Sequence, residues 1–144
     1  MEANSAPRWM HDPTCKPRVV ILGAPNRQRV RAELQRLRPA ISRQADIVAE
    51  DLAFEYEFQD SEQDLVIVLG GDGSILQAAR QMGRNPNPVL GINCGRLGFL
   101  ADLSPDDFLD TWPRLGEGAF EIVNHLMLRT SLVRNGSVIA EQLA

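Results

Sequence analysis

One carboxylate between glycines is the side chain in this sequence best placed to do chemistry. Asp72 lies in the segment 70–74 (GGDGS), which directly follows the apolar run 65–69. Glycines let a backbone approach a phosphate closely, and the free N–H groups at the start of a following helix favour an anion. A carboxylate at this position would repel phosphate. Its presence is explained if Asp72 binds a metal ion on the phosphates or accepts a proton from a hydroxyl. The structural alternative is that Asp72 caps the helix and the glycines only form a turn.

A second glycine-rich segment follows at residues 91–100 (GINCGRLGFL). It is not a GxGxxG dinucleotide fingerprint, and no such fingerprint occurs in the chain. Asn93 offers both a donor and an acceptor for a base or a ribose, and Phe99 could cover a ring. The alternative is a tight turn with Phe99 in the core.

The elements that must position these two segments follow from the hydrophobic pattern. Strands are expected at residues 18–23, 45–50, 64–69 and 89–92, and amphipathic helices at 27 to about 38, from 74 to 82 and from 105 onward. Asn26 is expected to cap the start of the first helix, and Pro39 to end or bend it. Ser104 is expected to cap the last helix, with Pro105 at its first position. Residues 51–63 are expected to form an acidic loop, although the alternating rings at residues 54, 56 and 58 could indicate a half-buried edge strand. We interpret these rings as core packing rather than as a stacking platform.

Alternating strands and helices predict βαβ units and a Rossmann-like, doubly wound parallel sheet. Ligands of such sheets bind beyond the carboxyl ends of the strands. Both glycine-rich segments begin at such ends, so the topology alone brings them together.

The pattern changes after residue 118. Strands are expected at 120–124 and 126–134, Asn135-Gly136 is a hairpin signal, and residues 137–144 would return. We therefore expect a flexible tail at 1–17, an α/β nucleotide-binding domain at 18–118, and the opening strands of an incomplete β-rich second domain at 119–144. The alternative is that the hairpin completes a small single domain.

Composition excludes several classes of protein. A net charge of -4 argues against a dedicated nucleic-acid binder. No apolar run approaches the ~20 residues of a membrane helix. The two cysteines, Cys15 and Cys94, make no disulfide framework, so a reducing, cytoplasmic setting is expected.

The basic residues exclude a P-loop and include a cluster of arginines. The only lysine is Lys16, so a P-loop, which needs a lysine on the phosphates, is absent. Arginines gather between residues 27 and 43. They form either a solvated helix face or a rim that attracts phosphate.

Taken together, the two glycine-rich segments resemble NAD kinase, the ATP-dependent family that makes NADP. The first segment alone is weak, since phosphofructokinases and lipid kinases also carry a Gly-Gly-Asp-Gly turn. The second, with its Leu-Gly-Phe-Leu ending, is much more specific. The resemblance spans about residues 18–144 and implies phosphoryl transfer from ATP or polyphosphate to the 2′-hydroxyl of the adenosine ribose of NAD.

The resemblance also implies a role for each matching residue. Asp72 would accept the proton of the 2′-hydroxyl as that oxygen attacks the γ-phosphate. Backbone donors at the phosphates would come from Gly71, Gly73 and Ser74, and the dinucleotide pocket would be lined by Leu76, Asn93, Phe99 and Leu100. Gln77 occupies a position near the substrate where many family members carry a basic residue, and Ser74 replaces the commoner threonine. Mg²⁺ or another divalent cation would escort the phosphates, with no residue assigned as its ligand.

Family members are about twice as long as this chain. The resemblance places an asparagine and an acid that bind the ribose and adenine beyond residues 141–144, so we expect the chain to be a truncated, inactive piece of an enzyme that forms homo-oligomers when intact. Two other functions remain open: a lipid or sugar kinase that shares the glycine turn, and a nucleotide-sensing module without catalysis.

Overall fold

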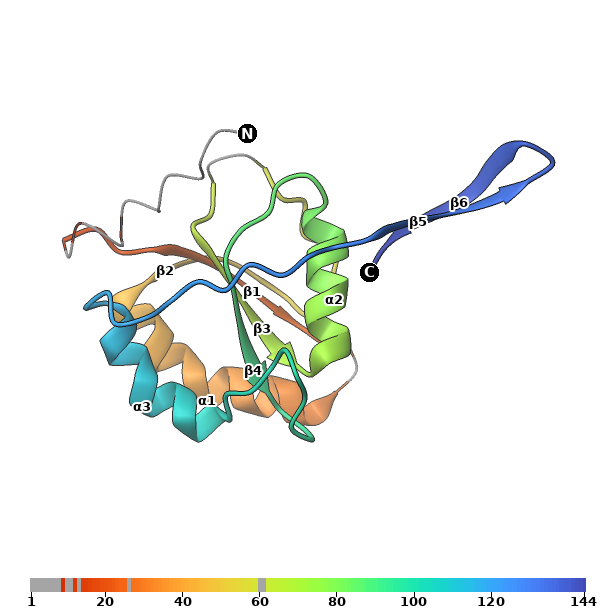
Figure 1. Cartoon of the computed structure of the whole chain (residues 1–144). Helices are drawn as coiled ribbons and strands as arrows, with labels where there is room; N and C mark the ends of the chain where they lie inside the picture. The colour runs from red at the N-terminus through yellow and green to blue at the C-terminus, as the bar shows by residue number, and fades with distance from the viewer. Residues whose placement is uncertain (1–8, 10–11, 13, 26, 60–61) are drawn as a thin grey trace.

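A four-stranded parallel sheet forms the centre of the molecule. The structure is a computed structural model, and it describes residues 9, 12, 14–25, 27–59 and 62–144. The strands are β1 (Arg18–Gly23), β2 (Asp46–Asp51), β3 (Leu65–Gly70) and β4 (Val89–Asn93), in the order β2-β1-β3-β4. All neighbours pair in parallel. The expected doubly wound α/β fold is therefore confirmed (Figure 1).

Helices cover both faces of this sheet. The helices α1 (Gln28–Gln44) and α3 (Pro105–Leu115) lie on one face, and α2 (Asp72–Met82) lies on the other (Figure 1). Ile21 and Ile67 point into the first layer, whereas Val20 and Val68 point into the second. The central strands β1 and β3 are buried on both faces, which explains their continuous apolar sequences.

The first helix is longer than its sequence predicts. We expected Pro39 to end or bend it near residue 38, but α1 runs to Gln44 with Pro39 inside. Ile41, one turn beyond the proline, is fully buried, and the indole N–H of Trp112 donates to the carbonyl of Ala40 at 3.1 Å. Packing against the sheet and α3 therefore outweighs the hydrogen bond that the proline cannot make.

The aromatic stretch after β2 is a loop rather than an edge strand. The rings of Phe54, Tyr56 and Phe58 pack against the α2 layer of the core, so the interpretation as core packing is confirmed. The carboxylate of Asp51 organises this loop by accepting hydrogen bonds from the N–H groups of residues 53, 55 and 56 at 2.7–2.8 Å. A hydrogen-bonded loop thus replaces the strand that alternation suggested.

The start of α3 has the predicted form. Ser104 is the N-cap, its hydroxyl accepts from the N–H of Asp107, and the Asp107 carboxylate in turn accepts from the N–H of Ser104. Pro105 occupies the first helical position. This capping box satisfies N–H groups that a helix start otherwise leaves free.

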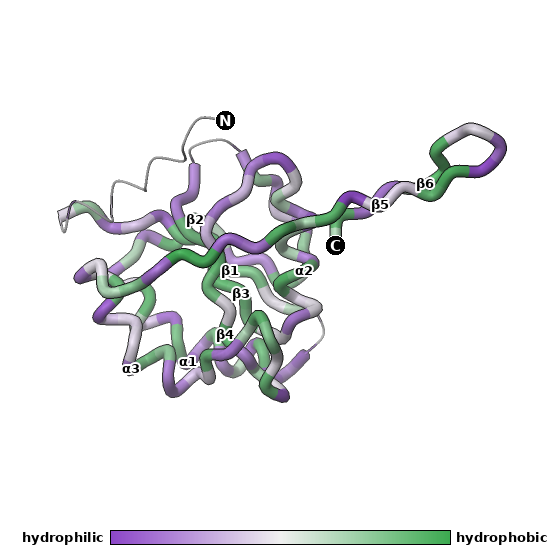
Figure 2. The backbone as a smooth tube through the Cα atoms, in the orientation of Figure 1, coloured by the Kyte–Doolittle hydropathy of each residue, from purple (hydrophilic) through white to green (hydrophobic). Residues whose placement is uncertain are grey.

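The chain after α3 ends in a hairpin that projects away from the sheet (Figure 1). The strands β5 (Arg129–Arg134) and β6 (Ser137–Leu143) are antiparallel, and Asn135 and Gly136 both have positive φ, as the Asn-Gly signal predicts. Residues 120–124 form no strand, contrary to expectation, because no neighbouring strand pairs with them. Apolar and polar residues are mixed along the hairpin, whereas β1 and β3 are hydrophobic (Figure 2).

The proposed division at residues 17 and 118 stays a prediction, and most of residues 1–13 lie outside the described part. Asn26, expected as the N-cap of α1, also lies outside it, and the cap position is Arg27. None of the described helices is long and apolar enough to span a bilayer.

Candidate functional site

The two glycine-rich segments meet at the carboxyl edge of the sheet, as the topology predicts. Gly70 at the end of β3 lies in register with Asn93 at the end of β4. Just beyond them, the N–H of Cys94 donates to the carbonyl of Gly70 at 3.0 Å. The first segment then enters α2, while the second forms a loop over residues 94–104 that leads into α3. Both therefore border one site.

Asp72 is the carboxylate at this junction, and it joins the two segments directly. One of its oxygens accepts from the N–H of Phe99 at 2.9 Å, and the other accepts from Leu100 at 2.9 Å and Ala101 at 3.2 Å. These three backbone hydrogen bonds, that of Phe99 foremost, lower the pKa of Asp72 below its usual range. The carboxylate is therefore ionised at neutral pH and held against the second segment.

The alternative that Asp72 only caps a helix is wrong. Asp72 is the first residue of α2, the N-cap is Gly71, and no side chain caps this helix. By accepting hydrogen bonds from residues 99–101, the carboxylate holds the second segment against the start of α2, which a local helix cap would not do.

Asn93 shapes the second loop. Its side chain is buried, and its amide N–H groups donate to the carbonyls of Arg96 at 2.6 Å and Ala101 at 2.9 Å. Its oxygen accepts from the N–H of Gly95 at 2.8 Å. The amide thus holds the loop in shape, and its role in lining a dinucleotide pocket stays a prediction.

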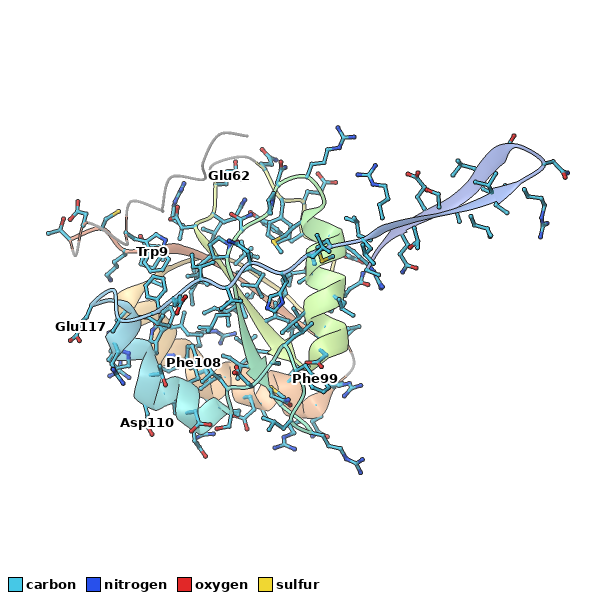
Figure 3. The ribbon with its side chains drawn as sticks, viewed as in Figure 1. Trp9, Glu62, Phe99, Phe108, Asp110 and Glu117 are labelled. Atoms are coloured by element: carbon cyan, nitrogen blue, oxygen red, sulfur yellow. The ribbon has the colours of Figure 1, made fainter. Side chains whose placement is uncertain are left out.

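Phe99 lies outside the core. Its side chain is 98% exposed, at the tip of the loop beside the start of α2 (Figure 3). The alternative of a packed core ring is therefore wrong. Leu97 in the same loop is 78% exposed, while Leu100 is partly buried. The loop thus offers apolar side chains at the site, and their contact with a dinucleotide stays a prediction.

The other predicted residues lie along the first turns of α2. The Cβ that any residue larger than glycine would place at Gly70 would come within 2.7 Å of the Cβ of Ser74, so the first glycine is required by this helix start. Gly73 is exposed, Leu76 is partly buried and Gln77 is exposed. Asp72, Phe99 and Leu100 are brought together, whereas Leu76 and Gln77 are a turn further along α2.

A cavity of about 500 Å³ opens beside this junction. We call it the arginine pocket, and it is lined by Arg27, Arg29, Val30, Gly70, Gly71, Asn93, Cys94, Gly95 and Arg96. Sequence reasoning placed Gly71 and Asn93 in the site and raised Arg27 and Arg29 as a phosphate-attracting rim, but it missed Arg96. Its position in the same glycine-rich segment as Asn93 marks it as near the site, but nothing in the sequence places it beside Arg27 and Arg29.

Two chemistries at this edge can be judged from the described residues. Burial, with a smaller contribution from Glu33, raises the pKa of the Cys94 thiol, so it is a packed thiol rather than a reactive thiolate. Within the described part of the chain, no group of three His, Cys, Asp or Glu side chains could hold a metal. The binding of a divalent cation stays a prediction.

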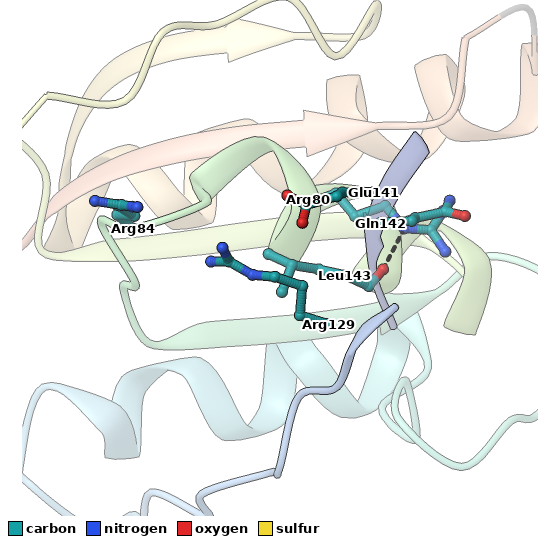
Figure 4. Close-up of a pocket in the computed structure, with 6 residues that line it drawn as sticks. All are labelled: Arg80, Arg84, Arg129, Glu141, Gln142 and Leu143. Atoms are coloured by element: carbon teal, nitrogen blue, oxygen red, sulfur yellow. Dashed lines mark hydrogen bonds between the residues drawn. The ribbon is translucent and has the colours of Figure 1, made fainter. Parts of the chain in front are cut away.

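A second cavity, of about 380 Å³, lies between α2 and the hairpin (Figure 4). The guanidinium of Arg80 donates to the carbonyl of Leu143 there at 2.8 Å. Glu141 also lines it, so positive charge is partly balanced. The hydrogen bond beside this cavity connects the hairpin to α2.

Comparisons with known proteins identify the family of this chain. The family model of the ATP-NAD kinase N-terminal domain matches residues 19–120, which include both glycine-rich segments and the helix α2 between them. The chain belongs to the NAD kinase family.

Relatives in this family share much of the sequence. The NAD kinase of Rhodopirellula baltica is 59% identical over 128 residues, covering 89% of this chain and 41% of the relative. The NAD kinase of Acetivibrio thermocellus is 38% identical over 106 residues, covering 67% and 37%. The chain thus spans less than half the length of these NAD kinases.

The fold of the family agrees as well. A crystal structure of yeast NADH kinase in complex with NADH superimposes with a TM-score of 0.70 at 19% identity, covering 90% of this chain and 46% of that one. At this identity the likeness supports the fold.

Proposed function

We propose that the intact protein transfers the terminal phosphoryl group of ATP or polyphosphate to the 2′-hydroxyl of the adenosine ribose of NAD, giving NADP. The observation that carries the proposal is the position of Asp72, an ionised carboxylate where the two family-typical segments meet. The arginine pocket beside it offers room and positive charge for the donor.

The proposed reaction forms one bond and breaks one. The 2′-oxygen of the ribose forms a bond to the terminal phosphorus, and the bond from that phosphorus to the bridging oxygen breaks. The electron pair leaves with the shortened donor, which is ADP when ATP is used. The proton of the hydroxyl passes to the carboxylate of Asp72.

The lowered pKa of Asp72 makes it a weak base, and this suits phosphoryl transfer. The transition state of such reactions is loose, so the nucleophile needs orientation more than early deprotonation. A carboxylate that stays ionised accepts a hydrogen bond from the hydroxyl, aims its oxygen, and takes the proton late. Three backbone N–H groups fix the direction in which that carboxylate points.

Several parts of the proposal depend on other residues. A bound Mg²⁺ ion would neutralise phosphate charge as the transferring bond breaks. The backbones of Gly71, Gly73 and Ser74 would donate to phosphates, Leu76, Asn93, Phe99 and Leu100 would line the dinucleotide pocket, and Gln77 would lie near the substrate. We propose a homo-oligomer in the cytoplasm as its working form.

The test is NADP formation by the intact protein that contains this chain. We expect Asp72→Asn to lower kcat by about 10²–10⁴-fold, the usual effect of removing a general base. Asp110→Asn, an exposed carboxylate on α3, is the matched control and should leave the rate unchanged. Full activity of Asp72→Asn with unchanged NAD binding would instead favour a nucleotide-sensing role. The expectation that the 144-residue chain is inactive by itself stays a prediction, which the same assay tests.

A further inference from the structure

The arginine pocket contains three positive charges without a protein counter-ion. Arg27 and Arg29 approach it from the start of α1, and Arg96 approaches from the loop after β4. Among the residues that the structure describes, none of these three guanidinium groups forms an ion pair. The nearby acid Glu33 is bound to Arg36, so it leaves the pocket arginines free for a ligand.

Every described residue that lines the pocket is basic, neutral or apolar, and no Asp or Glu is among these described residues. Like charges that gather without acids repel one another, and they are stabilised by a bound anion. Arginine suits a phosphate in particular, because its planar fork donates two parallel hydrogen bonds to a pair of phosphate oxygens.

Gly71, which lines the arginine pocket, has free space where a side chain would lie. A Cβ at Gly71 would meet no atom within 4 Å, and Gly71 has φ -130 and ψ -164, a conformation that any residue adopts. Neither backbone strain nor a neighbouring side chain therefore explains a glycine at this position. A ligand that lies against the backbone does explain it.

The helix starts around the pocket add to its positive potential. Neither α1, at Arg27, nor α2, at Gly71, has an N-cap side chain that forms a capping hydrogen bond, whereas α3, whose first residues are not among those lining the pocket, has a complete capping box. Free N–H groups at the two uncapped starts would complement the arginines in binding an anion.

We propose that the arginine pocket binds a chain of phosphate groups through Arg27, Arg29 and Arg96, with one end of the chain at Gly71. Its assignment as the site of the donor's polyphosphate rests on the proposed function. The end phosphate at Gly71 would lie next to Asp72, and the arginines would hold the phosphates further from the reaction. A cavity of about 500 Å³ accommodates a triphosphate.

The ligand chemistry is shared by ATP and inorganic polyphosphate, so the experiment uses both. Isothermal titration calorimetry of the 144-residue chain with sodium tripolyphosphate and with ATP, at low and at raised salt, measures Kd. We expect Arg29→Gln and Arg96→Gln each to weaken tripolyphosphate binding about tenfold, as the loss of a charge-assisted contact predicts. The salt dependence of Kd should also become less steep.

The control is Arg31→Gln, which removes the same charge from the same helix outside the pocket and should change Kd less than twofold. Circular dichroism verifies that each variant is folded. An equal loss of affinity for ATP and tripolyphosphate supports a site that binds phosphate groups alone. A loss of affinity for tripolyphosphate but not for ATP supports inorganic polyphosphate as the ligand. Kd values for Arg29→Gln and Arg96→Gln that match that of Arg31→Gln would overturn the proposal. Failure of NADP formation in the intact protein would instead overturn the proposed function and leave this binding intact.

Discussion

Gly98 lies against the carboxylate of Asp72 so closely that no side chain fits between them. A Cβ on Gly98 would come within 2.6 Å of the Asp72 Cγ. The next three residues donate their N–H groups to that carboxylate. Gly98 of the second segment therefore restricts the position of Asp72 in the first, although the two residues are 26 positions apart in the sequence.

This close approach predicts a strong effect of Gly98→Ala. The added methyl group must displace either the Asp72 carboxylate or the loop, so we expect kcat for NADP formation by the intact protein to fall at least tenfold, since small displacements of a catalytic group are costly. Steady-state kinetics measure it. The matched control is Gly116→Ala, where the new Cβ would lie 3.6 Å from its nearest neighbour, an ordinary contact. Equal rates for both variants would contradict the positioning role of Gly98.

The hydrogen bonds to Asp72 predict a pH-dependent contribution to stability. They lower the pKa of Asp72 in the folded chain, so its contribution is present above the unfolded-state pKa of about 3.9 and is lost as the pH falls through the lower folded value. We expect Asp72→Asn to lower Tm by a constant amount above about pH 5, with the difference narrowing below about pH 4. Thermal melts of the 144-residue chain across this range measure it. A difference that stays the same down to pH 2 would mean that these hydrogen bonds do not favour the ionised form.

Substitution of Gly71 tests whether a glycine is needed there for folding or for phosphate binding. Serine is a good N-cap residue, and it meets no neighbour at this position, so Gly71→Ser should leave Tm unchanged or raise it slightly. Its hydroxyl would accept from the N–H groups at the start of α2, which a phosphate needs, and its Cβ would fill the floor of the arginine pocket. We expect the Kd for tripolyphosphate to rise about tenfold. Calorimetry and a thermal melt of the same sample give both numbers, and unchanged binding would place the phosphate elsewhere.

Much of the fold could be predicted from local pattern. The four strands and the starts of α2 and α3 follow from apolar runs, glycine turns and the capping sequence at residues 104–107, because each signal is contained within a few residues. The length of α1 could not be predicted, since Pro39 is a local stop signal and the contacts of Ile41 and Trp112 that override it come from the tertiary structure. The absence of a strand at residues 120–124 has a similar cause, because a strand needs a partner that propensity does not supply.

The site could be predicted in outline for the same reason. Topology places both glycine-rich segments at one edge, and Asp72 stands out as a carboxylate in a phosphate-type turn. The hydrogen bonds from residues 99–101 to Asp72 depend on the shape of a loop, which Asn93 sets from within. Arg96 joins Arg27 and Arg29 only through that loop, so sequence reasoning had no basis for placing all three in one pocket.

Pro39 predicts a stabilising substitution. Pro39→Ala would restore an N–H inside α1 without changing the buried side of the helix, since Pro39 is exposed. The helix interior disfavours proline by about 3 kcal/mol, and part of this is offset because proline also restricts the unfolded chain by about 0.4–1 kcal/mol. We expect the free energy of unfolding to rise by about 2 kcal/mol, measured by urea denaturation. A decrease would show that the proline geometry is needed for α1 to pack on α3.

Phe99→Ala tests whether the exposed ring contributes to NAD binding without contributing to stability. With 98% of its side chain exposed, Phe99→Ala removes almost no packing, so the free energy of unfolding of the 144-residue chain should change by less than about 0.5 kcal/mol. Phe108→Ala, at a fully buried ring on α3, is the contrasting variant and should cost about 3–5 kcal/mol. If Phe99 covers a ring of the dinucleotide, Phe99→Ala in the intact protein should raise KM for NAD about tenfold, because the lost apolar contact is worth 1–2 kcal/mol. Its effect on kcat should be smaller, because a ring that covers the dinucleotide contributes to binding and not to the bond-making step. A fall in kcat at constant KM would assign Phe99 to the chemical step instead.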